Sequence, residues 1–326
     1  MLFAVRSIQA AENVNVPKLC SWLREERKES EMAILNMESD GMPGQVLIAL
    51  KALVTFGPMT KDRLIDICAP EPAIEPKRFR AAVTRWTQLG LFTEVDGRIR
   101  IASDYNWLSN LEGEEAIRQM PTVVREVALS EINNRKFWDA DSNLSADFTR
   151  AAAWMLAQDI YTLPSSPKQI QTLESRQIGN DGRRVLQNET RWNGFKHWSV
   201  FMGFASGDDP LVIDPTAAVR DSLPNIFKEA DTLAAVDFIE TLARLLPVLD
   251  FGSYRQLVEA EIRNTELELP SGDALSMSLS RALKRLEIGG LINFEARADA
   301  KQGYSFRGFA GRPWGRFTHI IYHGEA

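Results

Sequence analysis

Apolar residues recur with a helical period in one order near the front of the chain and again near its end. The first copy has a helical run at 46–56, a short helix after Thr60 and a third helix that begins at Lys77. Two strand-like segments follow around Asp96 and Gly97, a dipeptide that strongly favours a two-residue hairpin turn. In the third helix the apolar residues form one stripe with a helical spacing: Phe79, Val83, Trp86 and Leu89. The pattern predicts three helices and a β-hairpin.

The second copy has a helical run at 238–251, a short helix opened by a capping box at Ser253, and a third helix with Asp273 at its N-cap. Its apolar stripe consists of Leu275, Leu279, Ala282, Leu283 and Leu286. Both third helices end at a glycine, Gly90 or Gly290, because glycine accepts the positive φ that reverses the chain after a helix. Three helices, a glycine and a hairpin are the elements of a winged-helix domain, and such a repeat defines the architecture.

A third, degenerate copy is one interpretation of the middle of the chain. Residues 191–204 resemble a third helix that ends at a glycine and an apolar residue, and 210–219 resemble a strand broken by a turn. A helical run at 148–160 supplies one of the two helices that would precede them. A plain helical linker domain explains the same residues, and the pattern does not decide between the two.

The sequence therefore predicts a mostly α protein with short β-hairpins, in which two or three winged-helix domains are arranged around a helical middle. The expected parts are an N-terminal extension at 1–31, a winged-helix domain at 32–104, a helical middle at 105–235 with the degenerate copy near 148–222, and a second winged-helix domain at 236–326. The extension holds either a peripheral helix around Trp22 or a segment that precedes a true start at Met32. At 326 residues, two or three domains are the natural expectation.

Composition limits the class of protein. No run of about 18 apolar residues is present and the first residues lack the build of a signal peptide, so we expect neither a membrane span nor secretion. The two cysteines, Cys20 and Cys68, are too few for a disulfide framework and lie in apolar helical patterns. Buried reduced thiols and a cytoplasmic setting follow.

Positive charge gathers in the third helices and hairpins, although the whole chain carries a net charge of −6. Residues 77–100 hold six basic and two acidic side chains, and residues 281–323 hold eight and three, which gives local charges of +4 and +5. Winged-helix proteins contact DNA with these elements. We therefore expect contacts to duplex DNA from Lys77, Arg78, Arg80, Arg85, Arg98, Arg100, Arg281, Lys284, Arg285, Arg297, Lys301, Arg307, Arg312 and Arg316. A solvated basic face is the alternative for either copy.

The C-terminal copy is expected to be the stronger DNA-binding unit. Arg281, Lys284 and Arg285 stand at i, i+3 and i+4, so they share one face opposite the leucine stripe. The hairpin of this copy is also longer and more basic than the first one.

The glycine-rich stretch 307–316 interleaves arginines with Phe309 and Trp314. It fits neither a P-loop nor a dinucleotide fingerprint, because no strand-to-helix turn of the right spacing contains it. Arginines bind phosphates and aromatic rings stack on exposed bases. A loop that follows a nucleic-acid groove and a flexible wing loop are the two interpretations.

Residues that could support catalysis are sparse. His319 and His323 have the i, i+4 spacing of a helical zinc pair, but the glutamate of the metalloprotease motif is missing and the segment is rich in β-forming residues. His197 is the third histidine, and no Ser-His-Asp arrangement can be built from the three. We expect no enzymatic activity, no metal and no cofactor.

The segment MAILNMESDGMP at 32–43, which runs directly into the first helix, resembles the DpdG family. That family accompanies the bacterial system that places 7-deazaguanine derivatives in DNA. The resemblance implies a role in DNA modification or restriction, on the restriction side, and transfers no catalytic residues. The two terminal units also resemble the winged-helix domains of transcription regulators, restriction and defence proteins, and partner subunits of chromosome-organising complexes.

We interpret the chain as a non-enzymatic, double-stranded-DNA-binding component of a bacterial anti-phage defence or DNA modification system, working with other proteins of the same locus. One alternative is an interaction subunit whose winged helices bind a partner such as an ATPase or a nuclease. Another is a ligand-responsive transcription regulator with a pocket in its middle domain. Outward-facing cations on the third helices favour DNA, and an exposed apolar stripe there favours a protein partner.

Overall fold

The computed structural model describes residues 34–35, 42–69, 75–139, 144–263, 265–267, 269–300 and 302–324. These residues are mostly helical, with small antiparallel sheets of two or three strands, as the sequence predicts. The N-terminal extension with its peripheral helix, the start at Met32, and the side chains of Cys20 and Lys301 lie outside the described residues.

Three helices and a hairpin form the first unit: α3 (Pro43–Phe56), α4 (Lys61–Cys68), α5 (Pro76–Gln88), β1 (Phe92–Val95) and β2 (Arg98–Ile101). The Thr60 hydroxyl caps α4 by accepting a hydrogen bond from the Arg63 amide. Pro76 occupies the first turn of α5, where its missing N–H is not needed. Met59, between α3 and α4, pairs with Ile99 and thereby adds a short bridge to the edge of the hairpin. The elements predicted from the apolar pattern of this region are confirmed.

The middle of the chain begins with a connecting segment, η1 (Ser103–Asn110), α6 (Gly113–Leu129) and α7 (Glu131–Asn134). A second set of elements follows: α8 (Ala146–Ala157), α9 (Pro167–Gln177), η2 (Asp181–Arg183), α10 (Glu189–Phe201), β3 (Ala205–Ser206) and β4 (Val212–Ile213). Ser166 and Asn188 cap α9 and α10 by accepting hydrogen bonds from the amides of Gln169 and Arg191. α8, α9, α10 and the β3–β4 hairpin thus repeat the element order of the first unit. The division of the chain into domains stays a prediction.

The last set follows α11 (Thr216–Ile226). It contains β5 (Thr232–Ala234), α12 (Ala235–Leu245), α13 (Ser253–Glu259), α14 (Met277–Ile288), β6 (Ile292–Glu295), β7 (Tyr304–Arg307), η3 (Phe309–Gly311), β8 (Pro313–Phe317) and β9 (His319–Tyr322). Strands β5, β9 and β6 form one sheet, and β7 pairs with β8. The predicted helical run to residue 251 is wrong, because α12 ends at Leu245. The predicted capping box is also wrong: Gly252 is the N-cap of α13, and Ser253 is its first helical residue.

The predicted N-cap of α14 lies too early in the chain. Ser276, not Asp273, caps the helix, and its hydroxyl accepts a hydrogen bond from the Leu279 amide. The buried carboxylate of Asp250 accepts hydrogen bonds from the Ser276 amide and hydroxyl at 3.0 and 2.9 Å. This contact spans 26 residues. A tertiary hydrogen bond therefore selects the second of two residues that both suit a helix start.

The third helix of each set ends in the same hydrogen-bonded turn. The residue after a glycine donates its amide proton to a carbonyl five residues earlier, from Leu91 to Trp86 at 2.9 Å, from Phe204 to Ser199 at 2.8 Å, and from Leu291 to Leu286 at 3.1 Å. The glycines Gly90, Gly203 and Gly290 have φ angles of 90°, 80° and 76°. A left-handed residue at this position ends a helix and turns the chain into the next strand. The predicted helix stops at Gly90 and Gly290 are confirmed.

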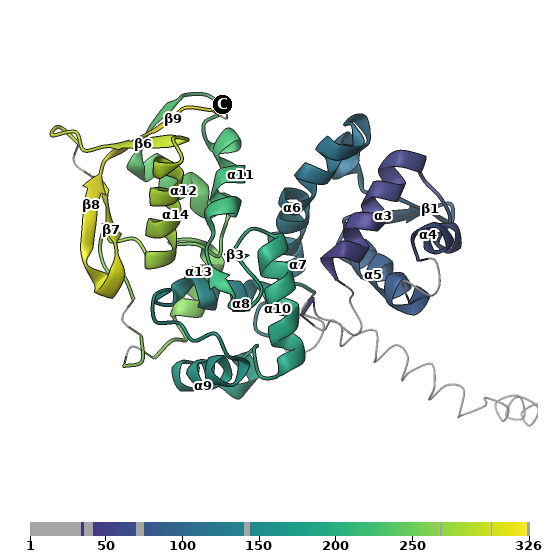
Figure 1. Cartoon of the computed structure of the whole chain (residues 1–326), viewed down its shortest axis with the longest axis horizontal. Coiled ribbons are helices and arrows are strands. Elements are labelled where there is room, and N and C mark those ends of the chain that lie inside the picture. Colours follow the sequence, from purple (N-terminus) through teal and green to yellow (C-terminus); the bar gives the residue numbers. More distant parts are fainter. Residues whose placement is uncertain are drawn as a thin grey trace, which may run out of the picture.

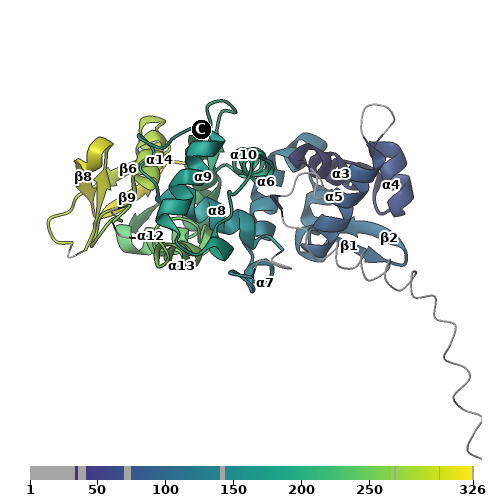
Figure 2. The ribbon, with the colours of Figure 1, turned by 90° about the horizontal axis from the view of Figure 1, so that it is seen from below.

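The first unit and the β7–β8 hairpin lie at opposite ends of the long axis of the molecule, with α8 to α10 between them (Figure 1, Figure 2). α3 packs against α6 and α10, and the ring centroids of Trp86 and Trp198 are 5.2 Å apart. On the other side, α13 packs along α8 and α11 packs along α14. The buried apolar residues form one connected core.

Candidate nucleic-acid interface

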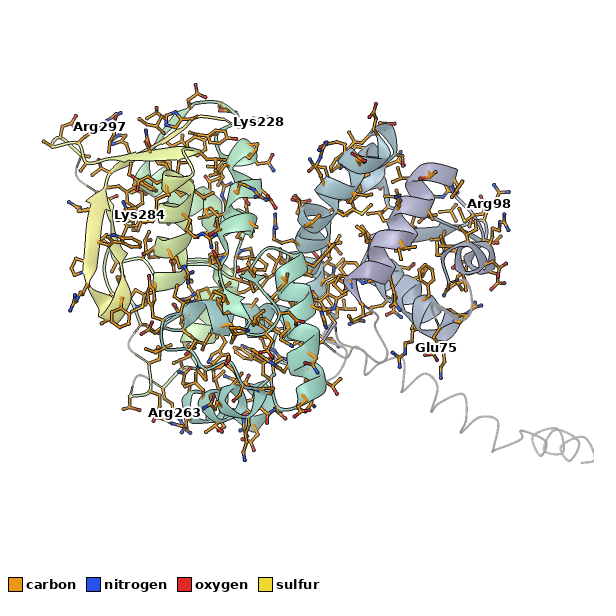
Figure 3. The ribbon with its side chains drawn as sticks, in the orientation of Figure 1. Glu75, Arg98, Lys228, Arg263, Lys284 and Arg297 are labelled. Atoms are coloured by element: carbon orange, nitrogen blue, oxygen red, sulfur yellow. The ribbon has the colours of Figure 1, made fainter. Side chains whose placement is uncertain are left out.

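Helix α5 presents a polar, basic face to solvent. It packs against α3, α4 and β1 of its own unit, and its buried residues Trp86 and Arg85 contact the middle of the protein. The apolar stripe lies on the inner side, and the exposed residues of the helix are Lys77, Arg78, Arg80 and Gln88. Glu75 at the start of the helix and Arg98 in the hairpin lie at the outer edge of the unit (Figure 3). This face is therefore accessible to a large ligand.

The three exposed cations of α5 are held only by surface contacts. Arg78 pairs with Glu75 at 2.9 Å and Arg80 pairs with Asp62 at 2.9 Å, and all four side chains are more than half exposed. Lys77 has no ion-pair partner within the described part of the chain. Exposed ion pairs contribute about 0–1 kcal/mol, so a phosphate can replace their carboxylates at little cost.

The expectation that Arg85 contacts DNA is wrong, because its side chain is buried. It is 2% exposed, and its guanidinium donates hydrogen bonds to the Leu144 carbonyl and to the Gln88 side chain. The contact to Leu144 ties α5 to the start of α8. Arg85 therefore holds the first unit to the middle of the protein.

The two arginines of the first hairpin differ in their surroundings. Arg98 follows the turn at Asp96 and Gly97, which have φ angles of 52° and 69°, and its side chain is exposed. Arg100 is half-buried and lines a cavity of about 700 Å³ together with Thr87, Gly90, Phe92, Thr93, Val95, Ile101, Ala102, Ser103 and Asn106. Its Nε is buried without a hydrogen-bond partner. Arg98 is thus available to an external phosphate, whereas Arg100, on the same face of the strand, is half-buried in this cavity.

Helix α14 has the same position in the last set but is covered by other elements. It packs against α11, α8, β6 and β7. Figure 3 shows Lys284 between α14 and the β7–β8 hairpin. Its Nζ lies 2.8 Å from Glu287 and 4.5 and 5.5 Å from the ring centroids of Phe306 and Phe294. Arg285 pairs with Asp214, whose side chain is only 3% exposed.

These contacts change the expectation for the C-terminal copy. Of the three cations predicted to share an outward face, Lys284 and Arg285 already have intramolecular partners. Arg281 is half-buried, and the most exposed residue of the helix is Ile288, at 82%. The outer surface of α14 is therefore poorly suited to binding phosphates.

The basic residues of the C-terminal hairpins fall into two groups. Arg297 pairs with Glu295 at 2.7 Å, and Arg316 lies 3.4 Å from Asp273. Arg307 and Arg312 flank the turn between β7 and β8, and the structure shows no ion pair for either among its described residues.

A protein-family model described as DpdG-like matches residues 32–300. The chain belongs to the DpdG-like family. This membership associates it with the Dpd 7-deazaguanine modification system. The matched range contains α5, the first hairpin and α14. Comparisons with curated proteins and with solved structures gave no match.

In this DpdG-like chain, His319 and His323 do not lie on a helix, as their β-rich segment leads us to expect. His319 lies in strand β9 and His323 follows it. Within the described ranges, no group of three or more histidine, cysteine or acidic side chains is placed to hold a metal ion. Helices that could cross a membrane are likewise absent from the part of the chain that the structure describes. Cys68 is a buried free thiol, and burial raises its pKa to about 11.

Proposed function

We propose that this chain is a non-catalytic, cytoplasmic component of the 7-deazaguanine DNA modification and restriction machinery, and that it binds double-stranded DNA through α5 and the β1–β2 hairpin. One observation carries the proposal: α5 alone among the three described third helices combines an accessible outer face with several exposed cations. A winged-helix interpretation of the first unit supports the same conclusion, because its third helix and wing are then the DNA-contacting elements.

The geometry of α5 suits the major groove of B-form DNA, which is about 12 Å wide and admits one helix. Lys77, Arg78 and Arg80 lie in the first turns of the helix, and Arg98 adds a contact from the hairpin. Contacts to phosphates fix position without reading sequence, so we expect weak sequence preference. Four phosphate contacts give a slope of about −3.6 when the logarithm of the binding constant is plotted against the logarithm of salt concentration.

The alternatives are less well supported by the surfaces of the third helices. The described part of α5 has no exposed large apolar side chain, and α14 has Ile288 alone. The apolar stripe expected of a protein-binding helix is thus missing from α5. A ligand-responsive regulator needs a pocket in the middle region. One cavity there, of about 360 Å³, lies between α9 and residues 184–187 and is lined by polar and charged residues. Other proteins of the defence locus remain expected partners through surfaces other than α5.

The test is a fluorescence-anisotropy titration of a labelled 20-base-pair duplex at several salt concentrations. We expect micromolar or tighter binding at about 50 mM salt, with the slope given above. Replacing Lys77, Arg78 and Arg80 with alanine should flatten the slope to about −1. A control variant removes three exposed cations elsewhere, Lys168, Lys228 and Arg263, and should keep the wild-type slope. Absence of binding at low salt, or equal effects of both variants, would contradict the proposal.

A further inference from the structure

The turn between β7 and β8 displays aromatic rings to solvent. Phe309 is 59% exposed and Trp314 is 45% exposed. Tyr161, 38% exposed, extends from the α8–α9 connection and meets Phe309 edge to face, with ring centroids 5.6 Å apart and an interplanar angle of 83°. Two segments separated by about 150 residues therefore contribute to one exposed aromatic cluster.

The backbone of the turn holds these rings outward. Ala310 and Gly311 have φ angles of 55° and 69°, and the Gly308 amide donates a hydrogen bond to the Arg312 carbonyl at 2.8 Å. Trp314 lies beside Gly308, where its Cε3 is 3.8 Å from the position that a Cβ would occupy. Exposed rings gathered in one region are typical of a binding surface.

Two arginines flank the turn in sequence: Arg312 is exposed, and Arg307 is half-buried with its guanidinium near Gly311. Arg307 and Arg312 precede and follow the turn and have no ion pair among the residues that the structure describes. The exposed large apolar side chains of the described residues in 302–317 are Phe309 and Trp314, both aromatic. Flat rings and forked cations without large exposed aliphatic side chains suit bases and phosphates better than the side chains of a protein partner.

We propose that this cluster is a binding site for single-stranded nucleic acid. Unpaired bases stack on Phe309 and Trp314, and Arg307 and Arg312 bind the neighbouring phosphates. Bases inside a duplex are already stacked on one another, so the rings have no access to their faces there. The site is therefore distinct in chemistry from the basic face of α5, and it lies at the other end of the molecule (Figure 1). It does not depend on duplex binding by α5.

The first experiment measures binding of a fluorescein-labelled 20-mer of thymidine, which has no secondary structure, by anisotropy. Changing Phe309→Ala together with Trp314→Ala should weaken binding by at least about tenfold, because each stacked base contributes substantially. The conservative pair Phe309→Tyr and Trp314→Phe should bind within about twofold of wild type, because both keep a ring. Phe56→Ala, a change at another ring that is 66% exposed at the end of α3, should have no effect.

The second experiment tests the phosphate contacts. Changing Arg307→Gln and Arg312→Gln should weaken binding of the same 20-mer and reduce its salt slope by about 1.4, since each contact to a single strand contributes about 0.7. The α5 triple variant should bind the 20-mer as wild type does, which separates this site from the duplex proposal. Melting curves of all variants show whether each one folds. If the Phe309→Ala, Trp314→Ala variant does not fold, the Arg307→Gln, Arg312→Gln variant tests the proposal instead. The proposal would be overturned if the wild-type protein failed to bind the 20-mer. It would also be overturned if the alanine pair folded and bound the 20-mer as tightly as wild type does. A protein partner for the cluster would then be the next hypothesis.

Discussion

Helices α5 and α14 occupy the same place in two copies of one element order, but their surroundings differ. Both end in the same turn at a positive-φ glycine. α5 packs on its own unit and, through Trp86 and Arg85, on the middle of the protein, but its outer face is exposed. α14 packs against α11, α8, β6 and β7. Three of the four cations of α5, Lys77, Arg78 and Arg80, are exposed to solvent, and two of the three cations of α14 are engaged in intramolecular contacts. Two copies of the same local fold can therefore expose different side chains to solvent.

Arg285 of α14 stabilises the fold. Asp214 precedes α11, where its carboxylate accepts hydrogen bonds from the Thr216 amide and hydroxyl. Arg285 neutralises this nearly buried carboxylate and so fixes α11 against α14. An acidic group that is taken out of water needs such a partner. Arg285 on α14 and Arg85 on α5 thus hold parts of the fold together, whereas Arg78 and Arg80 on α5 remain available for binding.

The largest expected difference is in affinity for duplex DNA. Replacing Lys77, Arg78 and Arg80 with alanine should weaken binding by about ten- to hundredfold, if each contact contributes roughly 0.5–1 kcal/mol. Replacing Arg281, Lys284 and Arg285 should weaken it by less than about threefold, because two of these cations are already paired. Both variants are titrated with one duplex at one salt concentration. Equal losses of affinity in the two variants would show that the packing of other elements around α14 does not prevent its cations from binding DNA.

The next prediction concerns the stability of α10, the third helix of the middle set. A Cβ added at Gly194 would lie 2.4 Å from the Leu35 carbonyl oxygen, so Gly194→Ala should lower the free energy of unfolding by about 1–3 kcal/mol. Gly44→Ala is the matched control, because nothing lies within 4 Å of its added Cβ. Urea unfolding followed by circular dichroism measures both. If Gly194→Ala is as stable as Gly44→Ala, α10 does not pack against the Leu35 backbone as closely as the structure shows.

The smallest expected effect separates the two roles of arginine. Arg285→Ala leaves the carboxylate of Asp214 without its ion pair and should lower the free energy of unfolding by about 1 kcal/mol. Arg80→Ala removes an exposed pair and should change it by less than about 0.5 kcal/mol. The two urea midpoints are compared under identical conditions. A larger loss for Arg80→Ala would reverse the assignment of cohesion to α14 and binding to α5.

The helices of the terminal units could be predicted because their signals are local. The apolar stripe of α5, the Asp96–Gly97 turn and the helix stops at Gly90 and Gly290 depend on spacing and backbone freedom within a few residues. The start of α14 could not be predicted in this way, because the hydrogen bond from Ser276 to Asp250 crosses 26 residues.

The binding surface was harder to predict for a related reason. A count of basic residues does not say which of them face solvent. The helical period could not identify Arg85 as buried, since it lies seven residues after the exposed Arg78 and so on nearly the same face of α5. Its partner Leu144 is distant in sequence. No periodicity could reveal that α11 covers α14 or that Asp214 would meet Arg285 across 71 residues.

Site-specific photo-crosslinking tests the central claim most directly. A photo-reactive amino acid is placed at Ala81 on the outer side of α5 or, in separate proteins, at Arg281 or Ile288 on α14. Each protein is irradiated with a labelled duplex and the covalent product is quantified on a denaturing gel. Contact through α5 predicts a strong product from position 81 and only background from positions 281 and 288. A product from α14 equal to or stronger than that from α5 would contradict the assignment of duplex binding to α5.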